Sequence, residues 1–186
     1  MTGTGSAERP LLRVGWRPAT EPSAADRLLA DLVTWHVGTT LPIRRRCGRC
    51  GSTSHGQPFV ERDRVHVSLG RAPGLALAAV STAGPVGVDV ERVGVAAFPG
   101  FDDVAVHPQE ARRDPTQTWV RKEALLKATG WGLAVDPRTV WIDDGRVVSW
   151  DSRLPDPGRC RLEDLPLTAA YVGAVAVIRP EGARAG

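Results

Sequence analysis

The sequence is poor in three features that mark well-known classes of protein. Its three cysteines are few and odd in number, which argues against the disulfide framework of a small secreted domain. Apolar runs are short: none approaches the length of a membrane span, and Leu11–Leu12 is no signal-peptide core. Lysine is also scarce, because only Lys122 and Lys127 occur among the 24 Lys and Arg side chains. These absences predict a cytoplasmic protein with no membrane partner.

The balance of charge is mildly basic. A formal net charge of +3 and a pI near 9.1 suit an anionic small molecule or an acidic protein partner, but are too weak by themselves to imply nucleic acid. The 186 residues can bury a substantial core, either as one domain or as two small halves. The chain shows no repeat of fixed short period.

The stretch 119–130, WVRKEALLKATG, gives the strongest helix prediction. It is rich in good helix formers and ends at Gly130, where a helix C-cap is expected. Just upstream, Asp114 and Thr116 are candidate N-caps, and Pro115 suits a first turn. Apolar residues recur at a spacing that predicts one buried face, made of Val120, Ala124, Leu125 and Ala128.

Glu123 and Lys127 lie four residues apart, on another face of this helix. A solvated ion pair is one interpretation, and such pairs are common and weak. A functional site is the other, because a chain that uses arginine almost everywhere keeps both of its lysines here. That choice hints at a need for a compact charge on a flexible stem.

A second pattern lies upstream, where 86–91 reads VGVDVE. The alternation predicts a strand in which Asp89 and Glu91 point the same way. Two carboxylates side by side can mark an exposed edge. They can also form a hard-cation site, since Mg²⁺ takes carboxylate oxygens, waters and substrate phosphates as ligands.

The segment 44–58 is rich in Gly, Ser and Arg and is predicted to be a loop. The arginine run 44–46 can bind phosphate or can simply be solvated, and the first interpretation is slightly favoured.

The same segment holds Cys47, Cys50 and His55, which are zinc-ligand types. A closed zinc site needs a fourth ligand. Cys160 and His66 are the only plausible additions, and neither has ligand-like spacing. Zinc is therefore the less favoured interpretation of this segment.

The rest of the chain predicts a succession of short elements. Strands are expected at 11–16, 65–70, 75–80, 140–142, 146–150, 161–165 and 170–178, with helices at 21–35 and from His107 to Glu110. The stretch 94–106 is expected to be irregular, and the terminal segments 1–10 and 179–186 to be flexible.

Taken together, GVDVE at 87–91 and WVRKEALLKATGWGL at 119–133 resemble the Sfp-type 4′-phosphopantetheinyl transferases. That family carries an (I/V)-G-(I/V)-D-(I/V/L)-E strand followed by a W/F-x-x-K-E-x-x-x-K helix, and both parts fit in the right order. Residues 50–58 are similar to the family's H-G-K-P segment, and 65–69 to the strand that follows it. The resemblance covers roughly residues 24–178.

The resemblance implies an α+β fold of two similar halves related by a pseudo-twofold, with the active site between them. The N-terminal half, 11–95, would contain the coenzyme A side and the D-x-E strand. The C-terminal half, 96–178, would contain the K-E-x-x-x-K helix. A pseudo-twofold within one chain makes a monomer the expected state.

The resemblance also implies a reaction. The 4′-phosphopantetheine arm of coenzyme A moves to a serine of an acyl or peptidyl carrier protein of fatty-acid, polyketide or nonribosomal-peptide synthesis, leaving 3′,5′-ADP. Asp89, Glu91 and Glu123 would hold Mg²⁺, with Mn²⁺ also suitable. Glu123 would act as base toward the serine, and Lys127 would contact the phosphate and help the leaving group. The implied catalytic residues are thus Asp89, Glu123 and Lys127.

The coenzyme A side is implied less completely. Its expected contacts are Arg27, Gln57, Pro58, Arg71 and Lys127. Two positions depart from the family: Gln57 replaces the Lys of H-G-K-P, and Gly70–Arg71 stands where Ser-His is frequent. Arg71 can still hold a phosphate, because a guanidinium forks onto phosphate well.

Two other hypotheses compete with the transferase. Gly70 and Gln57 favour a non-catalytic module, derived from such an enzyme, that binds coenzyme A or a carrier protein. The arginines 44–46 with Cys47 and Cys50 would instead suit a small zinc-loop protein that binds nucleic acid. The transferase is favoured over both, and no nucleic-acid partner is expected.

Overall fold

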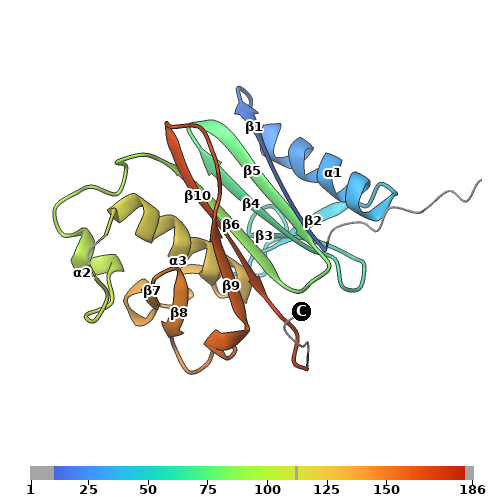
Figure 1. The fold of residues 1–186 in the computed structure, drawn as a ribbon. Coiled ribbons are helices and arrows are strands. Elements are labelled where there is room, and N and C mark those ends of the chain that lie inside the picture. The colour runs from blue at the N-terminus through green and yellow to red at the C-terminus, as the bar shows by residue number, and fades with distance from the viewer. Residues whose placement is uncertain (1–10, 112, 183–186) are drawn as a thin grey trace, which may run out of the picture.

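The structure, a computed structural model, describes residues 11–111 and 113–182 and shows a mixed α+β fold (Figure 1). It has three α-helices and several small antiparallel sheets in these ranges. Within the described ranges, no helix has the length and apolar character needed to cross a membrane. The predicted flexible segment 1–10 and the last part of the predicted tail, 183–186, lie outside the described residues.

The first three-stranded sheet is built from the N-terminal part of the chain. Its elements are β1 (Leu12–Ala19), α1 (Ala24–Val37), β4 (His66–Ala72) and β5 (Gly74–Ser81). The strands are antiparallel in the order β1-β5-β4. β5, the last of these strands in the sequence, therefore lies in the middle. The helix α1 packs on β5 and β1 with a face of alanine, leucine and valine.

The second three-stranded sheet comes from the C-terminal part. Its elements are β6 (Val86–Arg92), α2 (Phe101–Ala105), α3 (Pro115–Thr129), β9 (Cys160–Asp164) and β10 (Tyr171–Ile178). The strands are antiparallel in the order β6-β10-β9, so the last strand again lies in the middle. Both sheets thus follow the same order of strand, helix and two further strands.

Two hairpins complete the fold. One pairs β2 (Ile43–Arg46) with β3 (Gln57–Val60), and the other pairs β7 (Trp141–Asp143) with β8 (Arg146–Ser149). Three short 3₁₀ turns lie in the C-terminal part, namely η1 (Gly132–Ala134), η2 (Pro137–Thr139) and η3 (Pro157–Arg159). The predicted hairpin around Asp144–Gly145 is confirmed, with both residues at positive φ, as a tight hairpin turn requires.

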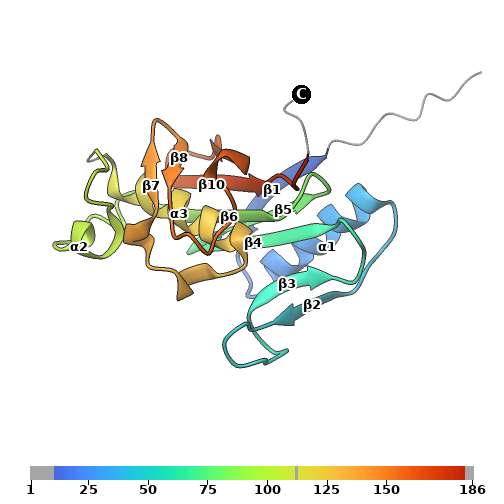
Figure 2. The ribbon, with the colours of Figure 1, turned by 90° about the horizontal axis from the view of Figure 1, so that it is seen from below.

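The two sheets meet at β4 and β6, which run side by side in Figure 2. The hydroxyl of Ser68 on β4 accepts a hydrogen bond of 3.0 Å from the backbone N–H of Val88 on β6. Gly70 faces the backbone of β6, where an added Cβ would lie 3.3 Å from the Cα of Asp89. A glycine at this position therefore lets the two strands lie close together.

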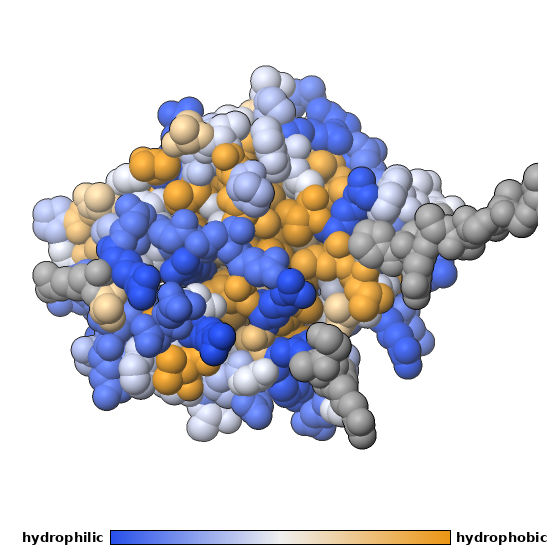
Figure 3. Space-filling view, in the orientation of Figure 1, coloured by the Kyte–Doolittle hydropathy of each residue, from blue (hydrophilic) through white to orange (hydrophobic). Residues whose placement is uncertain are grey.

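A shared apolar core joins the sheets on the faces that carry no helix. It contains residues of β5, β6 and β10, among them Leu77, Val88 and Val177. Partly buried apolar side chains of β1 and β10 border this core, and Figure 3 shows apolar side chains gathered in the middle of that view of the molecule. Burial of this surface holds the two parts together.

The main helix prediction is confirmed in its caps and its buried face. The carboxylate of Asp114 accepts a hydrogen bond of 2.8 Å from the N–H of Gln117, Pro115 begins the helix, and Gly130 ends it at φ +80°. The predicted apolar face is buried: Val120, Ala124, Leu125 and Ala128.

Four predictions of local structure are wrong. The segment 44–58 is not all loop, because its ends pair as β2 and β3. The strand predicted at 11–16 continues through Pro18 to Ala19; β1 is an edge strand, where a proline is tolerated.

The short helix from His107 to Glu110 is the third error. These residues form a turn in which the Glu110 carboxylate accepts a hydrogen bond from the N–H of His107, so side chains compete with helical bonding. The fourth error concerns 94–106, which was expected to be irregular but contains α2, where Phe101 and Ala105 are buried.

Candidate active site

The site is organised by a close contact between β6 and α3. A Cβ added to Gly87 would lie 2.0 Å from the carbonyl oxygen of Ala124 and 2.5 Å from the backbone nitrogen of Ala128. Such distances leave no room for a side chain, so the backbone of α3 lies directly against β6. The glycine of the GVDVE motif therefore sets the spacing of helix and strand.

The helix and the strand run in opposite directions. The C-terminal part of α3 lies over Gly87, at the start of β6, whereas the hydroxyl of Thr116, near the start of α3, accepts hydrogen bonds from the N–H groups of Gly94 and Ala96 beyond the end of β6. Side chains alternate along a strand, so Asp89 and Glu91 share the face of Gly87 and are directed toward α3.

Lys127 and Asp89 form the central contact of the site. The ammonium of Lys127 donates to Oδ1 of Asp89 at 2.6 Å and to the carbonyl oxygen of Val88 at 3.3 Å. The carboxylate is almost fully buried, with 8% of its side chain exposed, while 31% of the lysine side chain is exposed. The lysine thus neutralises a buried charge and keeps a face toward solvent.

The second oxygen of Asp89 has a different environment. Among the described residues, Oδ2 of Asp89 is buried and has no hydrogen-bond partner. Burial raises the pKa of Asp89, while the charge and the hydrogen bond of Lys127, and to a smaller extent the backbone N–H of Val90, oppose that rise. A buried, unpartnered carboxylate oxygen is the kind of group that a bound cation satisfies.

Glu91 and Glu123 belong to the same electrostatic environment. Burial is the main reason that the pKa of each carboxyl is raised. The negative charge of Asp89 raises both pKa values further, Glu91 acts in the same direction on Glu123, and Lys127 opposes the rise in both. The three predicted metal ligands are therefore close enough to disfavour one another's ionisation.

The three carboxylates are near one another but spread apart. Within the described part of the chain, the group of potential ligands whose ligand atoms all lie within 4.8 Å is Cys47, Cys50 and His55, and the carboxylates form no such group. Among the described residues, Lys127 is the cation that contacts Asp89. The oxygen donors, the free Oδ2 and the raised pKa values fit a hard divalent cation.

Lys122, the other lysine of α3, has a structural role that the sequence did not reveal. Its side chain is fully buried, and its ammonium lies 2.5 Å from the carboxylate of Glu110, which is 5% exposed. It also donates to the carbonyl oxygens of Ala105 and Pro137, at 2.6 and 3.2 Å. Burial lowers the pKa of Lys122, against the opposing effect of Glu110. Lys122 thus ties α2 and η2 to α3.

Two of the residues predicted to contact coenzyme A lie near the start of α1. Arg27 is paired with Glu21 at 3.0 Å, and Arg71 of β4 is paired with Asp26 at 2.8 Å. Arg71 and Glu21 line a pocket of about 300 Å³ between the start of α1 and the β4–β5 turn. These two arginines lie on the N-terminal part, whereas Lys127 lies on the C-terminal part.

Asp26 is a residue whose role the sequence did not signal. Its two oxygens bind different arginines, because Oδ1 also accepts a hydrogen bond from Arg45 of β2. Arg45 in turn donates to the carbonyl oxygen of Gly56 at 3.2 Å. Asp26 therefore anchors the β2–β3 hairpin beside α1, but in the sequence it is only an acidic residue in a first helical turn.

Gln57 and Pro58, the other predicted coenzyme A contacts, begin β3. Pro58 is buried and pairs with Arg45 in the hairpin. Gln57 is exposed and reaches the end of α3, since a Cβ added to Gly130 would lie 3.6 Å from its Oε1. The hairpin of the N-terminal part therefore approaches the helix that carries Lys127.

The three arginines of the run 44–46 do not form one free basic surface. Arg44 pairs with Glu61 at 3.1 Å, Arg45 lies on the opposite face of the strand, and Arg46 lies 5.6 Å from the ring of Phe59.

Comparisons with known proteins add no assignment: no family model matches the chain, and a search of curated proteins gave no match.

Proposed function

We propose that the chain is a 4′-phosphopantetheinyl transferase, which transfers the phosphopantetheine group of coenzyme A to a serine of an acyl or peptidyl carrier protein. The observation that supports this most strongly is the contact of β6 with α3. Two motifs about thirty residues apart in the sequence place Asp89, Glu123 and Lys127 in one electrostatic environment. Phosphoryl transfer requires mainly positioning and charge neutralisation, and these residues can supply both.

Asp89, Glu91 and Glu123 are the residues that would hold Mg²⁺, or Mn²⁺ in its place. Oδ2 of Asp89 is the oxygen available for it, since Lys127 contacts Oδ1. When bound, the cation neutralises charge on phosphoryl oxygens. The pKa values of all three carboxyls are raised, so their ionised forms are disfavoured in the protein alone. A bound cation would favour the ionised forms.

Glu123 is the proposed base. In the transfer, the Oγ of the carrier serine forms a bond to the β-phosphorus of coenzyme A, and the bond from that phosphorus to the 3′,5′-ADP oxygen breaks. The serine proton passes to Glu123 and then to solvent. A carboxylate can serve as base when it lies within hydrogen-bond reach of the hydroxyl, and Glu123 lies on α3 one helical turn from Lys127, beside the carboxylates of β6.

Lys127 is proposed to stabilise the leaving group. The bond pair goes to the departing 3′,5′-ADP, whose phosphate gains negative charge. The ammonium of Lys127 is partly exposed and one helical turn from Glu123, so it can contact a phosphate beside the base. The arginines Arg27 and Arg71, with Gln57 and Pro58, form the proposed coenzyme A side.

The shared strand order of the two sheets supports a further part of the proposal. Each sheet places its last strand in the middle and receives one long helix, which agrees with two similar halves related by a pseudo-twofold. The site then lies where the hairpin of one half approaches the helix of the other. A single chain contains both halves, so a monomer suffices for activity.

Intact mass spectrometry tests the function directly. An apo carrier protein is incubated with the chain, coenzyme A and Mg²⁺, and the expected result is a gain equal to one phosphopantetheine group, suppressed by EDTA. Carriers of fatty-acid, polyketide and nonribosomal-peptide type are each tried. Absence of a gain on all of them, from a folded protein that binds coenzyme A, would overturn the transferase in favour of a binding module.

A further inference from the structure

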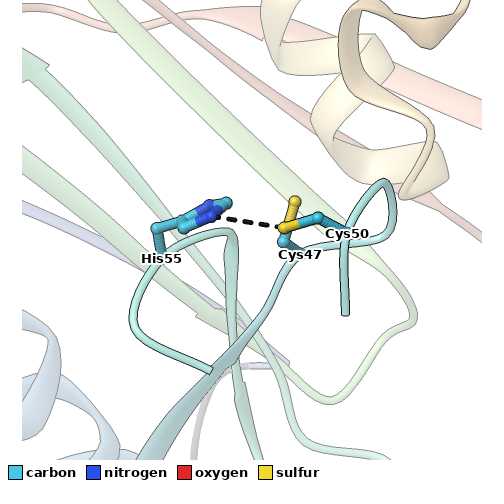
Figure 4. A group of neighbouring side chains, drawn as sticks. All are labelled: Cys47, Cys50 and His55. Atoms are coloured by element: carbon cyan, nitrogen blue, oxygen red, sulfur yellow. Dashed lines mark hydrogen bonds between the residues drawn. The ribbon is translucent and has the colours of Figure 1, made fainter. Parts of the chain in front are cut away.

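The loop between β2 and β3 brings three potential ligands of a soft cation together. The ligand atoms of Cys47, Cys50 and His55 all lie within 4.8 Å of one another. The Sγ of Cys50 is 3.4 Å from the Nε2 of His55, and Figure 4 shows the imidazole ring turned toward the sulfur atoms. The sequence spacing alone did not require this, because His55 lies five residues beyond Cys50.

The backbone of this loop is ordered by its own hydrogen bonds. The N–H of Gly51 donates to the carbonyl oxygen of Cys47, and the N–H of Cys47 donates to the carbonyl oxygen of Ser52, both at 2.9 Å. Gly56 closes the loop at φ +100°, where an added Cβ would lie 2.4 Å from the carbonyl oxygen of Arg46. The turn therefore fixes the two cysteines on one side before any ion binds.

The chemistry of the three groups selects a metal. Thiolate and imidazole ligands are typical of zinc, whereas Mg²⁺ requires oxygen donors. Two sulfur atoms and one imidazole nitrogen within reach of one ion therefore favour zinc over magnesium at this position.

We propose that Cys47, Cys50 and His55 bind one Zn²⁺ ion, with a water molecule as the fourth ligand. Cys50 and His55 are exposed and Cys47 is half-buried, so the fourth position faces solvent. Three protein ligands plus water is an established zinc arrangement.

The two residues considered as a fourth ligand are engaged elsewhere. Cys160 lies on β9 against the core beneath α3, and burial raises the pKa of its thiol to about 12. His66 lies on β4, opposite Ser81 of β5, and burial lowers the pKa of its imidazole. The zinc site is therefore confined to the β2–β3 loop.

The position of the loop lets a bound zinc ion act on the segment that approaches the end of α3. His55 precedes Gln57 by two residues, and Gln57 lies beside the end of α3. A metal bound at the base of the loop restricts the segment that leads into this contact. The zinc site does not depend on the proposed transferase activity, and each can be tested without the other.

Metal analysis of the 186-residue chain tests the proposal. The protein is prepared without a polyhistidine tag, reduced, incubated with zinc ions and freed of unbound metal. About one zinc per chain is expected in the natural sequence, with near-complete loss in Cys50→Ser. Cys160→Ser is the matched control, because it removes the one cysteine outside the loop and is expected to keep the full equivalent.

A second pair of measurements covers the case in which Cys50→Ser does not fold. Cobalt added to the natural protein is expected to give the absorption band of thiolate-to-metal charge transfer, which zinc then removes. Zinc is also expected to slow trypsin cleavage after Arg49, inside the loop, without slowing cleavage after Arg62.

Three results would overturn the zinc site. One is a reduced natural chain that binds no zinc and gives no cobalt–thiolate band. Another is a folded Cys50→Ser variant that keeps its zinc. The third is a Cys47–Cys50 disulfide that resists mild reductant and leaves no thiols for a metal.

Discussion

The two three-stranded sheets share a strand order, yet each holds its helix in a different way. Gly15 of β1 faces α1, where an added Cβ would meet the side chains of Leu32 and Leu28, at 3.2 and 3.7 Å. Gly87 of β6 faces α3, where an added Cβ would lie 2.0 Å from a backbone oxygen. Leucines therefore hold α1 away from its strand, whereas the backbone of α3 rests on β6.

The difference in spacing is accompanied by a difference in chemistry. The buried face of α1 is mainly alanine, leucine and valine. The corresponding helix α3 buries Lys122 completely and sets Lys127 against Asp89. The same order of elements thus serves packing in one part and a charged site in the other. The contact distance and the polar residues, rather than the topology, distinguish the two helices.

Removal of the carboxylates tests the charged contact most strongly. Asp89→Ala and Glu123→Ala are each expected to reduce carrier modification by about 10³-fold or more, because the cation and the base both depend on them. Rates are measured by intact mass, and folding by thermal unfolding. Asp164→Ala is the control: it removes an exposed carboxylate of β9 that pairs with Arg121 of α3, the helix that carries Glu123. Full activity in either site variant would disprove its assignment.

The buried pair of Lys122 and Glu110 should affect stability rather than chemistry. Lys122→Met is expected to lower the free energy of unfolding by about 3 kcal/mol or more, because it leaves the Glu110 carboxylate buried without its partner. Urea denaturation measures the change, and Arg121→Met, which breaks a pair whose Asp164 carboxylate stays exposed to solvent, is expected to cost less. A similar loss in both variants would remove the structural role given to Lys122.

Lys127→Met separates the two lysines of α3. We expect transfer to slow by about 10²-fold with little change in carrier affinity, because the ammonium acts on the leaving phosphate. The kcat and the KM for the carrier are measured separately. Lys127→Arg keeps the charge but changes its shape, and intermediate activity is expected. Unchanged kinetics in Lys127→Met would exclude this residue from the mechanism.

Alanine substitutions of Gly15 on β1 and Gly87 on β6 compare the two contacts between helix and strand directly. Gly87→Ala is expected to destabilise the protein by about 2 kcal/mol, because the methyl group meets backbone that cannot move independently. Gly15→Ala is expected to cost less than about 1 kcal/mol, because the end of a leucine side chain can shift. Equal changes in urea midpoint for the two variants would contradict the difference in spacing.

The smallest expected effect is a pH dependence of Glu123. Its pKa is raised above the ordinary value of 4.5, so its favourable contribution to stability is complete below that pH and is lost as the pH rises through the raised pKa. Without Mg²⁺, Glu123→Gln should therefore be more stable than the natural protein at neutral pH, by less than about 1 kcal/mol, and the gain should vanish in acid. Glu163→Gln, at an exposed position beside Arg161, is the matched control.

Much of the secondary structure was predictable because its signals are local. Alternation along β6, the caps of α3 and the turn at Asp144–Gly145 each depend on neighbouring residues, and each prediction is confirmed. The β2–β3 pairing was missed because the cue is not local: two short polar segments pair across a loop of ten residues. The short helix was predicted at 107–110 and lies instead at Phe101–Ala105, in α2, for a similar reason: its position depends on the burial of Phe101 against other parts of the chain.

The sequence by itself determined which residues share a face, because strand and helix periods fix that much: Asp89 with Glu91, and Glu123 with Lys127. It also determined a composition in which both lysines fall on one helix. Only the tertiary structure decided that Lys127 faces Asp89 while Lys122 is buried against Glu110, and that His55 lies beside Cys50. Periodicity is a property of one element, whereas the distance between two elements depends on how their surfaces pack.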